Sequence, residues 1–211
     1  ATGTGVIGDT PAQYTATMTQ VSCPGGNDGT ATANIIPAAP GATYTWSNGQ
    51  TTQTATGLTA GTYTCNVATP SGCSGSVTIT VTEIPGMILN LTNVVNANCN
   101  SINNGSANMN VTQGTPGYLY SWTGSASVSN MAIDLGAGPH TVTVTDANGC
   151  VRDTTFNISE PPALAISFLT QDTMICPEAS ITLSAQGIGG SSTYIFSWVD
   201  NNGNSFGPAS S

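Results

Sequence analysis

Short segments in which apolar and polar residues alternate run along most of this chain. Val, Ile and Thr are frequent within the segments, and Gly, Asn, Pro and Ser separate them. Alternation with a period of two is typical of β-strands, and the separating residues are typical of turns. No stretch long enough for a helix shows the helical period. The pattern therefore predicts an all-β fold.

The strand pattern is clearest in the middle of the chain. It predicts strands at residues 87–96, 106–112, 118–123, 131–135, 140–146 and 151–159. The sequence Asp146-Ala147-Asn148-Gly149 predicts a tight hairpin turn, because glycine tolerates a positive φ. Short strands separated by turns at this spacing are typical of an immunoglobulin-like antiparallel β-sandwich.

The same pattern recurs at a fixed interval. A cysteine followed by a tryptophan appears three times, and successive tryptophans are 76 residues apart. A constant period indicates a tandem array of one small domain. The pairs are Cys23 with Trp46, Cys99 with Trp122, and Cys176 with Trp198.

The repeat sets the expected domain boundaries. Residues 1–10 are expected to be a linker or the end of an upstream unit, and residues 11–84 and 85–160 two complete immunoglobulin-like repeats. Residues 161–211 are expected to be a third, incomplete repeat, which is either cut short or completed by strands from another chain. Proline residues at the joints restrict φ and favour extended chain, so we expect an elongated rod.

Composition narrows the function. The chain has one arginine, no lysine and ten acidic residues, for a net charge of −9. Nucleic-acid binding is excluded because it depends on Lys and Arg, and attraction to anionic membranes is disfavoured for the same reason. No apolar run is long enough for a transmembrane helix, so no membrane insertion is expected.

The aromatic residues are expected to be structural. Trp46, Trp122 and Trp198 occupy one place in the repeat, as a core tryptophan on the third strand of a sandwich would. The alternative is a sugar-stacking platform. Tyr63 fits the tyrosine corner of such domains, and His140 occupies the same position in the next repeat. A single histidine gives no support to a catalytic triad, and we expect no catalytic residues.

Four cysteines are expected to form disulfides within repeats. Cys23 and Cys73 are 50 residues apart, and Cys99 and Cys150 are 51 residues apart. In an oxidising compartment, each pair would stabilise a small sandwich with a limited core.

The other two cysteines are expected to be unpaired within this chain. The partner of Cys176 would lie beyond residue 211. Cys65 aligns with Val142 and is expected to be a buried free thiol. The alternative is that Cys65 replaces Cys73 as the partner of Cys23.

Metal sites have little support. Asp28, Asp146 and Asp153 lie near turns and could contribute to a calcium site, since calcium prefers oxygen ligands. Turn chemistry explains Asp28 and Asp146 equally well. We therefore expect no cofactor, with these three carboxylates as weak calcium candidates.

Several motifs together resemble a known family. Residues 23–33 read Cys-Pro-Gly-Gly-Asn-Asp-Gly-Thr-Ala-Thr-Ala, residues 44–50 read Tyr-Thr-Trp-Ser-Asn-Gly-Gln, and residues 142–150 read Val-Thr-Val-Thr-Asp-Ala-Asn-Gly-Cys. These resemble the SprB-type repeat of giant cell-surface gliding adhesins from Bacteroidota-type bacteria. The third unit, with Ser-Ile-Thr-Leu-Ser-Ala at 180–185, looks closer to a polycystic-kidney-disease-like or immunoglobulin-like module.

The resemblance implies a function and a location. It implies secretion through the type 9 pathway, display as a filament on the bacterial cell surface and adhesion during gliding. Asp-Thr motifs in related bacteria direct O-glycosylation, which points to Thr154 and Thr173. The expected partners are other repeats of the chain, surface polysaccharide, and the secretion or motility machinery.

We therefore expect a non-enzymatic structural and adhesive region of a secreted surface filament. One alternative is an array of carbohydrate-binding modules. Another is the accessory repeat region of a larger secreted enzyme.

Overall fold

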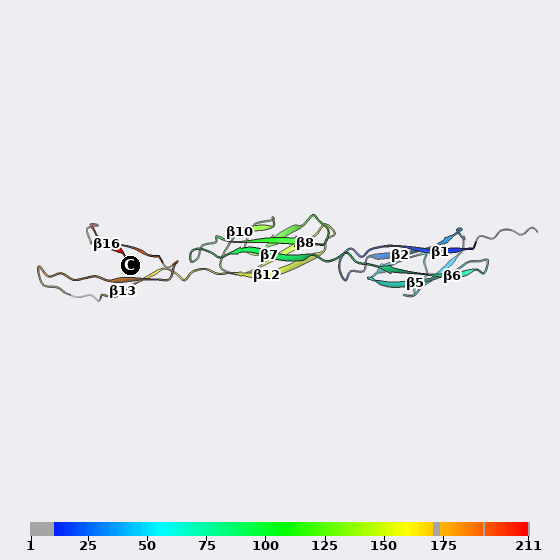
Figure 1. Cartoon of the computed structure of the whole chain (residues 1–211), viewed down its shortest axis with the longest axis horizontal. Helices are drawn as coiled ribbons and strands as arrows, with labels where there is room; N and C mark the ends of the chain where they lie inside the picture. Colours follow the sequence, from blue (N-terminus) through cyan, green and yellow to red (C-terminus); the bar gives the residue numbers. More distant parts are fainter. Residues whose placement is uncertain (1–10, 171–173, 192, 211) are drawn as a thin grey trace, which may run out of the picture. The chain divides into compact units, whose positions relative to one another are not determined.

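The computed structural model describes residues 11–170, 174–191 and 193–210. Every regular element in these residues is a β-strand, and the strands belong to several antiparallel sheets (Figure 1). The predicted all-β class is confirmed. No helix in the described part of the chain is long and apolar enough to cross a membrane.

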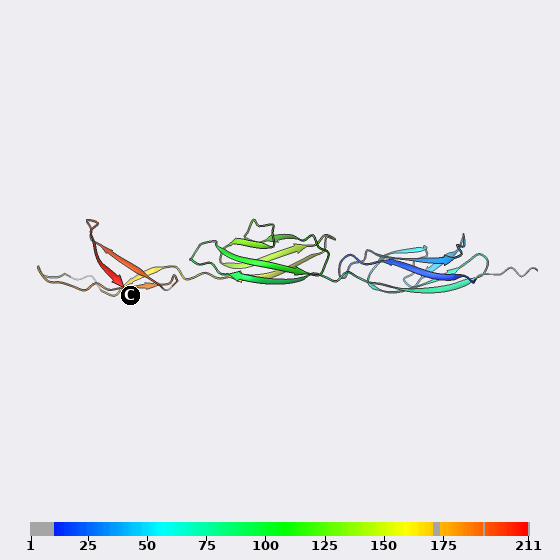
Figure 2. The ribbon, with the colours of Figure 1, turned by 45° about the horizontal axis from the view of Figure 1, so that its top comes forward.

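The first repeat is a sandwich of two three-stranded sheets. One sheet has the order β1 (Gln13–Thr19), β2 (Gly29–Ile36), β4 (Thr54–Leu58), and the other has the order β3 (Thr43–Trp46), β5 (Gly61–Ala68), β6 (Ser74–Val81). The two layers can be followed in two views (Figures 1 and 2). Immunoglobulin-like domains have the same arrangement, with their strands A, B and E in one sheet and their strands C, F and G in the facing sheet.

Alternation along the strands places the core between the sheets. In β2, Ala31 and Ala33 are buried, while Thr32 between them is half-buried. In β5, Cys65 and Val67 point the same way and are buried. The core of the first repeat consists of Val21, Ala31, Ala33, Trp46, Ala55, Leu58, Cys65, Val67 and Val81.

The second repeat has the same order of strands. Strands β7 (Ile88–Val95), β8 (Gly105–Thr112) and β10 (Met131–Leu135) form one sheet, and β9 (Leu119–Trp122), β11 (Gly138–Thr145) and β12 (Val151–Ile158) form the other. Each strand begins and ends within two residues of its predicted range, and the largest difference is at β11, which begins at Gly138 and not at residue 140.

One glycine in each repeat permits a close approach between the sheets. A Cβ on Gly29 would lie 2.8 Å from Val81 Cγ1 and 2.9 Å from the carbonyl oxygen of Leu58. A Cβ on Gly105 would lie 2.7 Å from Ile158 Cγ2. Any larger side chain would force the sheets apart at this position, so the Asp-Gly and Asn-Gly of the repeat have a packing role.

The described strands after residue 160 form two antiparallel pairs. Strand β13 (Ala165–Phe168) pairs with β14 (Ala185–Ile188), and β15 (Ile195–Val199) pairs with β16 (Ser205–Ser210). Large apolar side chains remain exposed there, with Phe168 at 71% and Ile195 at 95%. The described residues of this segment therefore leave unburied the apolar side chains that a sandwich would enclose.

The chain divides into two compact units, and the division does not follow the repeats. The first unit extends to Ile88 and also contains residues 112–118 and 145–151. The second unit contains residues 89–111, 119–144 and 152–211. Two loops of the second repeat therefore group with the first sandwich.

Candidate functional site: a disulfide-linked joint

A disulfide connects the two complete repeats. Cys23 of the first repeat is bonded to Cys150 of the second, with their Cα atoms 5.5 Å apart and 127 residues between them in sequence. Both cysteines belong to the first compact unit. We call this region the joint. It comprises the loop 21–28 of the first repeat, and the loop 113–118 and the turn 146–150 of the second.

The expected pairing of Cys23 with Cys73, and of Cys99 with Cys150, is wrong. Cys73 lies in the turn that begins β6, whereas Val21, close to Cys23, bridges to Glu83 beyond the other end of β6. A strand rises about 3.3 Å per residue, so the two cysteines lie about 30 Å apart. A disulfide needs Cα atoms within about 7 Å.

The pair Cys99–Cys150 is excluded for the same reason, because the two cysteines lie at opposite ends of β12. The N–H of Ala97, close to Cys99, donates to the carbonyl of Ser159 at the end of β12, and Cys150 immediately precedes the start of β12. Cys99 and Cys73 are free and exposed. The alternative pairing of Cys65 with Cys23 is also wrong, because Cys65 is a free, buried thiol.

The loop that holds Cys23 is fixed by hydrogen bonds. The N–H and the hydroxyl of Ser22 both donate to the Asp28 carboxylate, at 2.9 and 2.5 Å. The N–H of Gly26 donates to the carbonyl of Cys23 at 2.9 Å, and the N–H of Gly25 donates to Glu83 Oε2 at 2.9 Å. The hydrogen bonds from the side chain and N–H of Ser22 lower the pKa of the Asp28 carboxyl.

The turn that holds Cys150 is built around Asp146. Its carboxylate Oδ1 accepts hydrogen bonds from the N–H groups of Asn148 and Cys150, at 2.9 and 3.0 Å. Oδ2 accepts from the N–H of Thr115 at 3.0 Å, which fixes the turn to the neighbouring loop. Asp146 is only 4% exposed. Desolvation opposes ionisation, but these backbone donors outweigh it and lower the pKa of Asp146.

Further hydrogen bonds hold the loop 113–118 of the second repeat to Pro85 and to the turn 146–150. The N–H of Gly114 donates to the carbonyl of Pro85 at 3.1 Å, and the N–H of Ala147 donates to the carbonyl of Thr115 at 3.2 Å. The side-chain amide of Asn148 donates to Thr115 Oγ1 at 2.9 Å. The Cys150 sulfur is therefore presented by a loop and a turn that support each other.

The tryptophans of the two complete repeats lie in the cores. Trp46 is 2% exposed and Trp122 4% exposed, and each indole N–H donates to a backbone carbonyl, that of Thr52 or Ser129. Trp198 in the third segment is half-buried. Neither core indole can serve as a sugar-stacking platform, because neither face reaches the surface.

Tyr63 and His140 perform the same local task. The Tyr63 hydroxyl donates to the carbonyl of Thr59, four residues earlier. Nε2 of His140 lies 2.8 Å from the carbonyl oxygen of Gly136, also four residues earlier, and Nδ1 lies 2.7 Å from that of Thr123. The ring also stacks at a tilt on Phe156. The structure thus uses this histidine as a backbone partner in the corner.

Cys65 faces the core from β5, opposite Trp46 in the strand register. Desolvation raises the pKa of its thiol, which keeps it protonated and unreactive. Cys73, Cys99 and Cys176 are exposed. The accessible thiols therefore lie at turns and loops and not within the strands.

The three carboxylates named as weak calcium candidates do not form a metal site. The Asp28 and Asp146 carboxylates accept hydrogen bonds from turn backbone, and Asp153 is exposed on β12. No group of three His, Cys, Asp or Glu side chains suited to a metal occurs in the described residues. The glycosylation candidate Thr154 is half-buried on β12 next to Asp153, and Thr173 lies outside the described residues.

A known family matches the chain at two places. Residues 15–51 and 91–127 match the SprB repeat. The predicted resemblance is confirmed for these segments, each of which runs from the first strand of a sandwich past its buried tryptophan. SprB repeats are typical of extracellular surface proteins. No curated protein matches the chain.

Solved structures with similar chains are distant in sequence. One contains three N-terminal domains of the bacteriophage RB49 highly immunogenic outer capsid protein, with 16% identity, a TM-score of 0.49, and coverage of 93% of this chain and 78% of that one. A C-terminal fragment of intimin, in complex with the intimin-binding domain of the translocated intimin receptor, has 12% identity, a TM-score of 0.33, and coverage of 74% and 67%. Immunoglobulin domains 1–5 of Sidekick-1 have 12% identity, a TM-score of 0.33, and coverage of 96% and 50%.

Proposed function

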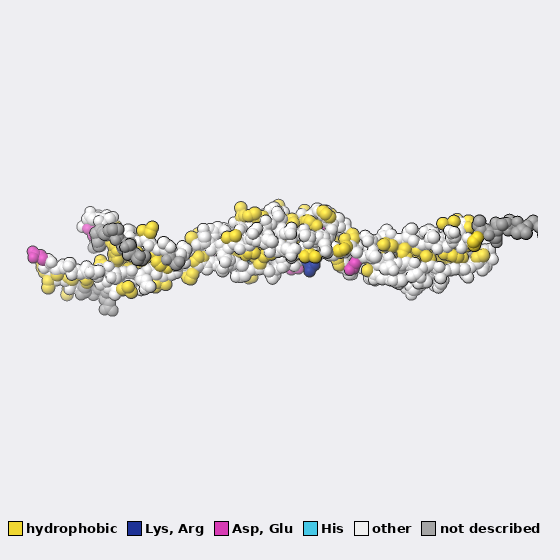
Figure 3. All heavy atoms as spheres, viewed as in Figure 1, with side chains coloured by type: hydrophobic (Ala, Val, Ile, Leu, Met, Phe, Trp, Pro, Cys, Tyr) yellow, Lys and Arg dark blue, Asp and Glu magenta, His cyan; other side chains and the backbone are white. Residues whose placement is uncertain are grey.

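We propose that this chain is a non-enzymatic repeat region of a secreted adhesin-type filament on a bacterial cell surface, used in attachment or gliding and exported by the type 9 pathway. The SprB matches support a surface adhesin-type repeat region. The surface chemistry agrees with this role, since charged side chains are sparse over the face seen in Figure 3.

The observation that carries this proposal is the disulfide between consecutive repeats. A pulling force that enters along β1 reaches Cys23, crosses the disulfide to Cys150 and leaves along β12. The chain between the two cysteines lies outside this path. Strands β2 to β11 therefore lie outside the covalent path of the force while the bond is intact, which suits a stalk that must transmit tension with little extension.

A competing role in sugar binding loses its expected platform. Trp46 and Trp122 are buried, so aromatic stacking on a sugar ring would have to come from other residues. The described residues likewise bring together no catalytic pair around His140, which contacts backbone carbonyls.

The test uses cells of the source bacterium. Antibodies against the purified chain should label intact cells, and the labelling should disappear when surface proteins are shaved with protease. Cells carrying an in-frame deletion of residues 11–160 should attach less to glass and to polysaccharide-coated surfaces under flow than the parent cells. The matched control is a Thr56→Ala strain, because Thr56 is exposed and lies outside the joint. Normal attachment by a deletion strain that still displays the shortened protein would rule out an adhesive or stalk role.

A further inference from the structure

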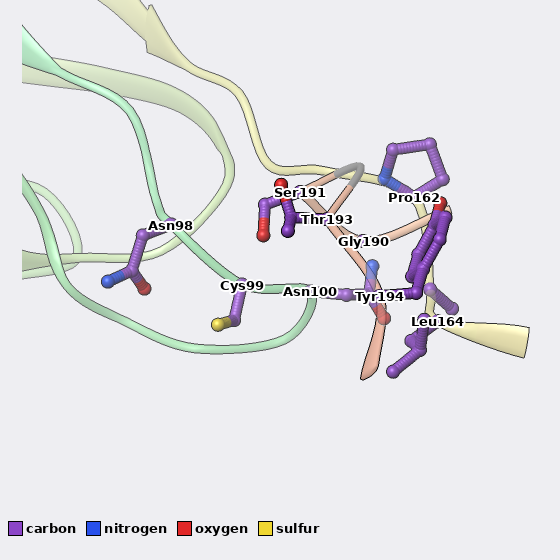
Figure 4. Close-up of a pocket in the computed structure, with 10 residues that line it drawn as sticks. Asn98, Cys99, Asn100, Pro162, Leu164, Gly190, Ser191, Thr193 and Tyr194 are labelled. Carbon is purple, nitrogen blue, oxygen red and sulfur yellow. The ribbon is translucent and has the colours of Figure 1, made fainter. Parts of the chain in front are cut away.

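Cys99 lines an open cavity at the end of the second sandwich. The cavity has a volume of about 440 Å³, and its other lining residues include Pro162, Gly190, Ser191, Thr193 and Tyr194. Figure 4 shows Cys99 on one side of it and Ser191, Thr193 and Tyr194 on the other. All of these residues belong to the second compact unit.

The loop that carries Cys99 repeats the construction of the Cys23 loop. The N–H of Asn98 donates to Asn104 Oδ1 at 3.1 Å, as that of Ser22 donates to Asp28. The N–H of Ser101 donates to Glu160 Oε2, as that of Gly25 donates to Glu83. The same hydrogen bonds therefore fix the loop around Cys99 and the loop around Cys23, which forms a disulfide.

The opposite wall of the cavity repeats the loop 113–118 of the joint. The N–H of Gly190 donates to the carbonyl of Pro162 at 2.8 Å, just as that of Gly114 donates to Pro85. Gly114 and Gly190 both have positive φ, at 70° and 60°.

A tyrosine anchors both loops in the same way. The Tyr118 hydroxyl donates to the carbonyl of Gln113, and the Tyr194 hydroxyl donates to that of Gly189, each five residues earlier. In the first compact unit, Thr115 of this loop holds the turn that delivers Cys150. The equivalent position in the second unit, Ser191, lines the open cavity instead.

We propose that Cys99 forms a disulfide with a cysteine from the last hairpin turn of the sandwich that follows the second repeat, and that this turn fills the cavity. The turn expected there has an Asp or Thr that accepts backbone hydrogen bonds, followed by Gly and Cys, as at 146–150. The inference extends the observed Cys23–Cys150 bond to a rule in which each repeat is bonded to the next. It does not depend on the adhesive role.

The same rule assigns Cys73 to the sandwich that precedes the first repeat. Its turn has the form of the Cys150 turn, with Thr69 in place of Asp146. The N–H of Thr69 donates to the carbonyl of Cys73 at 2.8 Å, and the N–H of Cys73 donates to Thr69 Oγ1 at 3.1 Å. Gly72, like Gly149, has a positive φ.

The chemistry needs a disulfide oxidant, such as oxidised glutathione. Each new bond removes one proton and one electron from each of two thiols. The oxidant's own disulfide accepts both electrons and both protons and becomes two thiols. The bond forms by thiolate attack through a mixed disulfide, which the exposure of Cys99 permits.

The test inserts a second copy of residues 85–161 directly after Pro161 of the full chain, so that a complete sandwich follows the second repeat. The chain as it stands has four free thiols. After refolding with oxidised and reduced glutathione, the extended chain should again show four free thiols on denaturation, although the insertion adds two cysteines.

Two serine variants distinguish this bond from one within the inserted copy. Cys99→Ser in the first copy should raise the thiol count by one, because the inserted Cys150 then has no partner and remains a free thiol. Cys99→Ser in the second copy should lower the count by one, because it removes only a free thiol. The reverse result would show pairing within a repeat. A fall of one in both variants, from a starting count of six free thiols, would show that both copies of Cys99 stay free. Either outcome overturns the proposal.

Mapping the disulfide bonds of the native protein provides a second test of the Cys99 bond, and this test does not depend on refolding. Thiols of cells from the source bacterium are blocked with iodoacetamide, and unreduced peptides are then identified by mass spectrometry. Cys99 should appear bonded to a Gly-Cys peptide from outside residues 1–211. Recovery of Cys99 as the alkylated thiol, or bonded to Cys73 or Cys150, would overturn the proposal.

Discussion

The load path through the disulfide makes a quantitative prediction for single-molecule stretching. When the chain is pulled from its two ends, the disulfide keeps the segment between Cys23 and Cys150 out of the extending chain. The 127-residue separation corresponds to about 440 Å of extended backbone. Reduction should therefore lengthen the fully unfolded chain by about this amount.

The length distinguishes the observed bond from the pairing expected within repeats. A bond from Cys23 to Cys73 spans 50 residues, which would hide only about 170 Å in the first repeat. The two arrangements thus differ by a factor of more than two for each bond, which contour-length measurements resolve easily.

The assay compares matched serine variants in a force spectrometer. Cys150→Ser should show the longer contour length without any reductant. Cys73→Ser should behave like the parent chain, because Cys73 is free. Core packing should be similar in both variants, since neither cysteine belongs to the buried core. The reasoning would be refuted if Cys73→Ser lengthened the chain or if reduction released two separate lengths of about 170 Å, one from each repeat.

Three further predictions concern packing, pH and thiol reactivity. Gly29→Ala should lower the free energy of unfolding of the first repeat, measured in urea, by about 1–3 kcal/mol, because the new Cβ would collide with Val81 of the facing sheet. The control Thr56→Ala, at an exposed position, should change this free energy little. Equal effects of the two substitutions would contradict the packing argument. Folding lowers the pKa of Asp146, so the ionised carboxylate stabilises the folded protein fully above its ordinary pKa of 3.8, and this stabilisation is lost as the pH falls through the lower pKa of the folded state. The melting temperature should therefore fall in this acidic range, and it should fall less steeply in Asp146→Asn. Parallel curves for the parent and the variant would show that Asp146 makes no such contribution. Alkylation should modify Cys73 at once but Cys65 only on unfolding, and rapid modification of Cys65 in the native state would contradict its burial.

The strand pattern was predictable because it depends on local alternation. The core tryptophans and the corner residues repeat with the period, so their structural roles could be inferred from position alone. The corner role of His140 was visible in its alignment with Tyr63 and does not depend on the imidazole itself. Both residues reach the carbonyl four residues earlier.

The disulfide pairing could not be read from spacing. Separations of 50 and 51 residues suit a bond within each repeat, but spacing along the chain carries no information about which end of a sandwich a loop occupies. Counting strands offers the missing signal. Cys23 lies between β1 and β2, at the end of the sandwich where β6 finishes, and Cys73 lies where β6 begins.

By itself, then, the sequence determined the fold class, the period, the strands of the second repeat and the core positions of Trp46 and Trp122, because these follow from local side-chain chemistry repeated at a fixed interval. Only the tertiary structure decided which cysteines meet. That choice depends on the antiparallel path of the strands, which brings the 146–150 turn of one repeat to the 21–28 loop of the repeat before it. Distance in space, and not separation in sequence, sets whether two thiols can bond.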